Sequence, residues 1–124
     1  MRAPIIKDII RQHAEQAAFL WVVYDRHLQF PDENPDLDAI RLDRLIERLE
    51  AHLDGLREAG EDGKSIARER FDEFPEAGEL FVLRMVETGT RIPIKELDAT
   101  KVRTFITQKI GMNGPSVDQS SSRS

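Results

Sequence analysis

The 124-residue sequence predicts an all-α domain of four or five helices, in which an antiparallel helix pair carries a second, shorter helix pair. Two observations predict this fold class. Residues 34–60 repeat leucine and isoleucine at steps of three and four, which places these side chains on one face of a helix. Residues 4–28 carry a comparable apolar face, and only the short connection 29–33 separates the two segments. Helices joined by so short a connection pack side by side in opposite directions.

The segment from Asn34 to Gly60 has the clearest helical period. Asn34 followed by Pro35 predicts its start, because an asparagine side chain can accept hydrogen bonds from free N–H groups and proline has a helical φ. Gly60 predicts its end. Gly55 inside this helix favours the close approach of a neighbouring helix, under Trp21. The residues predicted to face the core are Leu42, Leu45, Ile46, Leu49, Leu53 and Leu56.

The first helix, residues 4–28, has an unusually wide apolar face. A helix that is apolar around most of its circumference is normally buried between several other elements. The centre of the face consists of Ile6, Ile10, His13, Ala17, Leu20, Trp21 and Tyr24. The residues that widen it are Ile5, Ile9, Ala14, Ala18, Phe19 and Val22. We therefore expect the first two helices to form the main core between them.

The remainder of the chain predicts three weaker helices. After a turn at residues 61–63, a short helix covers residues 64–74 and a fourth helix covers 76–87. Residues 90–94 are predicted to be extended or turn-like, and a last helix covers 95–110, although its threonines lower helix propensity. Residues 111–124 are rich in Gly and Ser and are predicted to be disordered. The expected organisation is a single domain, 1–110, with a tail, 111–124.

Composition excludes several function classes. A net charge of −5 argues against sequence-independent binding of nucleic acid, which requires a basic face. The absence of cysteine excludes disulfides, thiolate catalysis and cysteine metal sites. No apolar run approaches the roughly 20 residues that cross a bilayer, and the N-terminus has no signal-peptide core. We expect no nucleic-acid or membrane partner and a cytoplasmic location.

Two histidines, His13 and His52, lie on the apolar faces of the first and second helices. They are predicted to form a polar part of the core, satisfied by a carbonyl or a carboxylate, because buried polar groups need partners. The alternative is that they meet across the helix pair and bind a metal with a nearby carboxylate: Glu15, Glu50 or Asp54. Metal sites in helix bundles usually use Glu-x-x-His pairs, and neither histidine has a glutamate three residues before it. The sequence therefore favours a polar core without metal or cofactor.

No group of residues predicts catalysis. The acidic residues have Arg or Lys neighbours at helical spacing, which is typical of a solvated charged face rather than of a general acid with a shifted pKa. Gly55, Gly60 and Gly63 do not have the spacing of a phosphate-binding loop. Ser65 has no plausible base in register. The sequence predicts that the protein is not an enzyme.

Two segments carry a family resemblance: QHAEQAAFLW at 12–21 and RLDRLIERLEAHLDGLREAG at 41–60, with AHLDGL as the most specific part. They resemble the N-terminal region of a family of uncharacterised proteobacterial HEAT-repeat proteins, and the likeness extends more loosely through 71–89. The resemblance implies a bacterial HEAT-like scaffold or interaction protein, with an association to type VI secretion gene neighbourhoods. In that family a long array of helix-pair repeats follows this region, whereas this sequence ends soon after its last predicted helix.

The expected function is a non-enzymatic protein–protein interaction or scaffold module of HEAT-like type. The alternative is a small immunity or adaptor protein that binds a secreted partner. The first and last helices carry more apolar surface than one neighbouring helix can cover, and such surface usually marks an interaction site. The expected partner is therefore another protein or a second copy of the chain in a homodimer, and the acidic face of the second helix could orient a basic partner. The predicted interaction surface consists of Trp21, Val22, Phe105 and Ile106.

Overall fold

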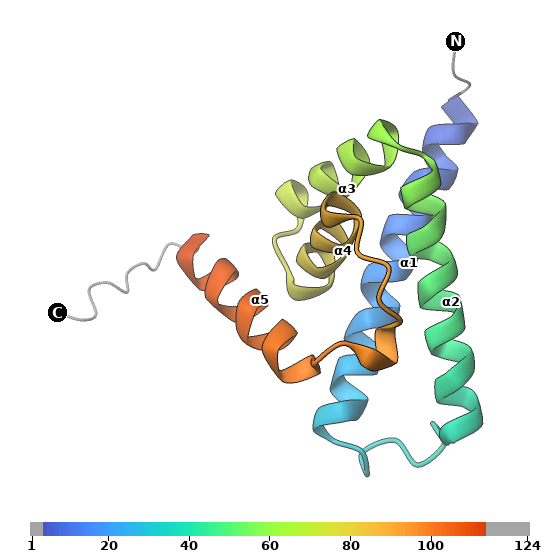
Figure 1. Ribbon diagram of the computed structural model, residues 1–124, viewed down its shortest axis with the longest axis vertical. Coiled ribbons are helices and arrows are strands. Elements are labelled where there is room, and N and C mark those ends of the chain that lie inside the picture. Colours follow the sequence, from blue (N-terminus) through green and yellow to red (C-terminus); the bar gives the residue numbers. More distant parts are fainter. Residues whose placement is uncertain (1–3, 114–124) are drawn as a thin grey trace, which may run out of the picture.

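The computed structural model describes residues 4–113, and the side chains of residues 7–110. This part of the chain is all-α, as predicted, and contains no strand. In order, the elements are α1 (Pro4–Gln29), α2 (Ala39–Glu58), α3 (Glu61–Glu73), α4 (Ala77–Thr88), the 3-10 turn η1 (Ile94–Glu96) and α5 (Ala99–Asn113). Figure 1 shows α1 and α2 side by side as the two long helices, with α3 and α4 packed on the pair and α5 extending away from it.

The main core lies between α1 and α2, as the two apolar faces predict. Leu45, Ile46, Leu49, Leu53 and Leu56 of α2 are all buried. They belong to one cluster with the buried apolar residues of α1, which are Ile10, Ala14, Ala17, Ala18, Leu20, Trp21 and Tyr24. The face of α1 is not buried around its full width, however. Ile9, Phe19 and Val22 are exposed, because no described element covers that side of the helix.

The start of α2 differs from the prediction. The helix begins at Ala39, and its cap is Asp38, whose carboxylate accepts a hydrogen bond from the backbone N–H of Arg41 at 2.9 Å. Asn34 instead closes a turn in the connection, where its side-chain oxygen accepts from the N–H of Asp36 at 3.3 Å. Aspartate and asparagine cap helices equally well. The helix starts at the later of the two signals because the earlier one forms a turn.

The corner between α2 and α3 is tighter than predicted. Gly60 has a φ of +62°, which glycine adopts readily, and α3 begins at the next residue rather than at position 64. Residues 61–63, expected to be a turn, form the first turn of α3. A Cβ atom added at Gly63 would lie 2.0 Å from the carbonyl oxygen of Leu56. Glycine at this position therefore allows the start of α3 to lie directly on the end of α2.

The most buried helix is α4, which lies between α1, α3 and α5. A Cβ atom at Gly78 would come within 2.5 Å of the carbonyl oxygen of Ala18, so the glycine permits close backbone packing of α4 on α1. The helix ends at Gly89, which has a φ of +66°. Its buried large side chains are Leu80, Phe81, Val82, Leu83, Met85 and Val86.

The last helix begins later than position 95, because η1 occupies residues 94–96. The carboxylate of Asp98 accepts hydrogen bonds from the backbone N–H groups of Thr100 and Lys101, which sets the start of α5 at Ala99. The helix continues to Asn113, so residues 111–113 of the expected tail belong to α5. The rest of that tail lies outside the described residues. No helix within residues 4–113 has both the length and the apolar content needed to cross a membrane.

Candidate functional site

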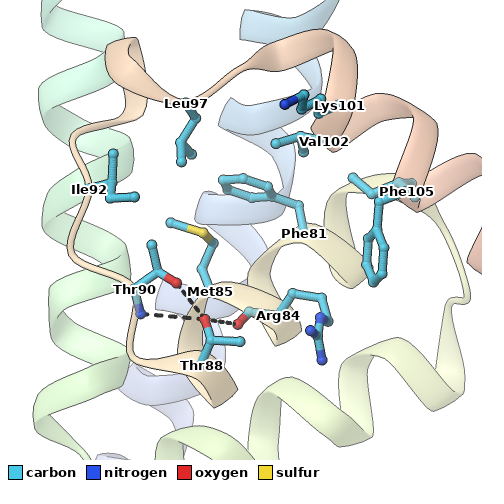
Figure 2. A pocket seen from close by; sticks show the side chains of 11 residues that line it. Phe81, Arg84, Met85, Thr88, Thr90, Ile92, Leu97, Lys101, Val102 and Phe105 are labelled. Atoms are coloured by element: carbon cyan, nitrogen blue, oxygen red, sulfur yellow. Dashed lines mark hydrogen bonds between the residues drawn. The ribbon is translucent and has the colours of Figure 1, made fainter.

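An open groove of about 360 Å³ lies between α4, the segment 89–98 and α5. In Figure 2, Ile92 lies on one side of the groove and Phe105 on the other, with Phe81 between them. Phe81 and Met85 of α4 are buried and form its floor, whereas Ile92 at its edge is 51% exposed. The lining is mainly apolar and comprises Phe81, Arg84, Met85, Thr88, Thr90, Ile92, Leu97, Lys101, Val102, Phe105 and Ile106.

A partly buried ion pair holds one wall of the groove, α5, against α1. Arg103 donates from Nη2 to Oδ1 of Asp25 at 2.6 Å and from Nε to the same oxygen at 3.0 Å. Asp25 is 7% exposed, and Gln29 donates to its other oxygen at 2.9 Å. A buried carboxylate requires such partners. The contact fixes the first half of α5, while the end of this helix extends away from the other helices (Figure 1).

The charged face of α2 holds the opposite wall, the segment 89–98. The carboxylate of Glu50 accepts from the backbone N–H of Ile94 at 2.8 Å, and Arg57 donates to the carbonyl oxygen of Thr90 at 2.5 Å. Two ion pairs join the same segments at the surface: Lys95 with Asp43, and Arg91 with Asp54. The sequence predicts a solvated face here. Asp43 and Asp54 are exposed, in agreement with this prediction, whereas Glu50 is half-buried and the side chain of Arg57 is only 8% exposed. No local pattern could have revealed contacts between residues so far apart in the chain.

The charged residues that line the groove, Arg84 and Lys101, are both positive. Arg84 lies over the ring of Phe105, 5.2 Å from its centroid, and Lys109 lies 5.6 Å from the same centroid. Arg84 also forms a long ion pair with Glu87 at 3.9 Å, but Arg68 binds the other carboxylate oxygen of Glu87 at 2.7 Å. The groove is therefore locally basic in a chain whose net charge is −5.

The four residues predicted as an interaction surface do not form one surface. Phe105 and Ile106 line the groove, but Ile106 is only 4% exposed and lies at its base. Trp21 is also 4% exposed and stacks against Phe81, with ring centroids 4.9 Å apart. The prediction of Trp21 as a contact residue is wrong because α4 covers it. Val22 is exposed, but it belongs to a separate hollow near the connection between α1 and α2.

The two histidines meet across the α1–α2 pair, half-buried. The Nδ1 atoms of His13 and His52 are 3.0 Å apart, so one ring donates to the other, and the ring centroids are 5.2 Å apart. The partner of each imidazole is thus the other imidazole rather than a carbonyl or a carboxylate. A Cβ atom at Gly55 would lie 2.8 Å from the ring of His13. The glycine therefore makes room for His13, and not for Trp21 as the sequence predicts.

Burial lowers the pKa of His52, and the positive charges of His13 and Arg48 lower this pKa further. The pair therefore favours a neutral His52 that shares one hydrogen bond with His13. A second proton on the pair would remove the acceptor and place two positive charges together.

The carboxylates considered as metal ligands with these histidines bind elsewhere. Glu15 pairs with Arg70 at 3.4 Å, and Asp54 pairs with Arg57 at 2.9 Å, while Glu50 holds the segment 89–98. Among the side chains that the structure describes, no three His, Asp or Glu residues are grouped so that they could hold a metal ion.

Comparison of the chain with models of protein families, with curated proteins and with solved structures gives no match. The resemblance of residues 12–21 and 41–60 to HEAT-repeat proteins therefore stays a prediction.

Proposed function

We propose that the chain is a non-enzymatic protein-binding module that receives a segment of its partner in the groove between α4, the segment 89–98 and α5. The observation that carries this proposal is an open, mainly apolar groove that no other described segment covers. Ile92 and Phe105 present apolar atoms at its two edges. Exposing such atoms to water is unfavourable, and contiguous apolar hollows commonly mark binding sites.

The walls of the groove support this proposal because each is anchored to the core. The floor belongs to α4, which packs between three other helices. Glu50 and Arg57 hold the segment 89–98, and Asp25 holds α5 through Arg103. A surface organised in advance loses little conformational entropy when a partner binds.

The chemistry of the lining favours binding over catalysis. The lining residues include no histidine or carboxylate that could act as a general base. Its two hydroxyl groups, those of Thr88 and Thr90, bond to each other at 2.7 Å, and Thr88 also donates to the carbonyl oxygen of Arg84 (Figure 2). The polar groups at this end of the groove therefore satisfy one another. A HEAT-like interaction role, as the sequence resemblance implies, is consistent with this arrangement.

Site-directed photo-cross-linking tests the proposal. A photo-reactive amino acid is placed at Ile92, in the groove, and in a matched variant at Ile40, which is 65% exposed on α2 and outside the groove. Irradiation in lysate of the native host should join one protein to the chain at position 92 and not at position 40. Equal products at both positions, or none at position 92, would contradict binding in the groove. A product that contains two copies of the chain would identify the partner as a homodimer, which light scattering on a sizing column would check.

A further inference from the structure

We infer that the groove recognises an acidic amphipathic helix, with apolar side chains seated over Phe81 and carboxylates placed against Arg84 and Lys101. This inference rests on the proposed function and adds the chemical class of the partner. It uses two features of the groove that are independent of each other: the apolar character of its floor and the sign of the charge at its edges.

The shape of the groove suits a helix that inserts a few side chains. A volume of about 360 Å³ is small for a binding site and is open to solvent along its length. Helix-in-groove recognition uses apolar residues spaced at i, i+3, i+4 and i+7, which project from one face into such a hollow. Between Ile92 and Phe105, the groove floor at Phe81 and the side chain of Val102 offer the apolar contact (Figure 2).

The charges at the edge determine the sign of the partner. Lys101 is exposed and has no side-chain partner among the described residues. Among the described residues, the carboxylate that Arg84 contacts is that of Glu87, at 3.9 Å, and its other oxygen is already bound by Arg68. Both cations can therefore bind a carboxylate of a partner, and the carboxylate would then be paired when the interface is buried. No acidic side chain lines the groove, so its lining presents only positive charge to an acidic segment.

Other occupants fit these observations less well. Two lining cations are few for a nucleic-acid backbone, and an anionic membrane attracts clusters of about four to eight basic residues. The segment 114–124 of this chain, GPSVDQSSSRS, offers Val117 as its only large apolar residue. Three acidic residues of α2, Asp43, Glu50 and Asp54, already bind the segment 89–98. The exposed Glu47 and Glu58 of the same helix do not line the groove.

The test uses three synthetic helical peptides of equal length, held helical by a side-chain cross-link and labelled with a fluorophore. The first has leucine and phenylalanine on one face and glutamate beside it. The second has the same apolar face with lysine in place of glutamate, and the third keeps the glutamates but replaces the apolar face with glutamine. Fluorescence anisotropy with the full chain should show the first peptide binding at least tenfold more tightly than the other two.

Charge reversal locates the effect. The double variant Arg84→Glu and Lys101→Glu should lose the preference for the acidic peptide and bind the basic one instead. The control is Lys7→Glu with Arg44→Glu, which makes the same change in net charge at exposed positions outside the groove. It should keep the preference of the unmodified chain. Phe105→Ala should weaken the binding of the first two peptides to the same extent, because both present the same apolar face to the groove.

The outcomes separate this inference from the proposed function. If the acidic and basic peptides bind alike, or if the control variant loses the preference as fully as the groove variant does, the acidic-helix inference is overturned. Absence of binding by all three peptides also overturns it. In each case, cross-linking at position 92 decides independently whether the groove binds a protein. A dimer that Phe105→Asp dissociates, and with which the peptides do not compete, would identify a second copy as the occupant and overturn the inference as well.

Discussion

At the scale of single residues, apolar and charged side chains that lie close together in the sequence of α2 differ sharply in burial. Leu49 of α2 has no exposed surface, whereas Glu47, two positions earlier, is exposed. Two positions on a helix correspond to a rotation of roughly 200°, so the two side chains point to opposite sides of α2. One faces α1 and the other faces solvent, and their contributions to stability should differ accordingly.

Replacing Leu49 with alanine should therefore lower the free energy of unfolding by about 2 to 5 kcal/mol, because the change removes buried contacts and leaves a cavity. Glu47→Ala should change this free energy by no more than roughly 0.5 kcal/mol. Chemical denaturation followed by circular dichroism measures both values. Equal effects would mean that the two faces of α2 have been interchanged.

The histidine pair should make stability depend on pH. In the folded chain the pKa of His52 lies below its ordinary value, chiefly because of burial, with further lowering by His13 and Arg48. The unfolded chain therefore takes up this proton first as the pH falls. The stabilisation present above a pH of about 6.5 is lost progressively below it, down to the pKa of the folded state.

In the unmodified chain, the melting temperature should decrease as the pH is lowered from about 8 to about 5.5. His52→Gln should show a flatter profile over the same range, because glutamine does not titrate. Burial raises the pKa of Glu79, and this favours the folded state at low pH, opposite to the effect of His52. The difference between the two profiles isolates the contribution of the histidine pair. Parallel profiles would contradict it.

At the scale of elements, close helix packing depends on glycine at α2–α3 and α1–α4, whereas an ion pair joins α5 to α1. Gly63 and Gly78 bring helices to within backbone contact. The first half of α5 is held by Arg103 and Asp25, which lie 78 positions apart. The groove exists because α5 is anchored at this point and its later turns extend outward (Figure 1).

Arg103→Ala should release α5 and leave the carboxylate of Asp25 buried with only Gln29 as its partner. We expect the free energy of unfolding to fall by about 2 kcal/mol, and hydrogen exchange to accelerate across residues 99–110. Arg26→Ala removes an exposed pair with Glu33 and serves as the matched control. It should leave exchange in α5 unchanged. If exchange in α5 stays slow in Arg103→Ala, packing on α4 alone positions this helix.

At the scale of the whole molecule, charge is distributed unevenly. The chain is acidic overall, but three acids on α2 (Asp43, Glu50 and Asp54) bind Arg57, Arg91, Lys95 and the backbone of the segment 89–98. The groove on the other side of that segment carries positive charge alone. The segment 89–98 therefore contacts acidic residues of α2 on one side and forms a wall of the basic groove on the other. The sign of the net charge therefore does not indicate the sign of the site.

The sequence by itself determined the helical class, the antiparallel pair and its core, because these depend on apolar spacing within single segments. The period along residues 42–56 identifies the buried face of α2 without reference to any other element. The same spacing placed His13 and His52 on facing sides of the pair. It could not tell that they would bond to each other, because this depends on the relative shift of two helices and on the space above Gly55.

Only the tertiary structure decided which apolar residues are covered and which charged residues are engaged. Trp21 and Val22 are neighbours in an apolar run, yet α4 buries the first and leaves the second exposed. In the sequence, Glu50 cannot be distinguished from other surface glutamates, but in the structure it accepts a hydrogen bond from the N–H of Ile94. The groove is likewise made of residues from α4, a connecting segment and α5, none of which has a distinctive local pattern. Local spacing encodes which side of a helix is apolar, whereas the contacts that form a site depend on where distant helices pack.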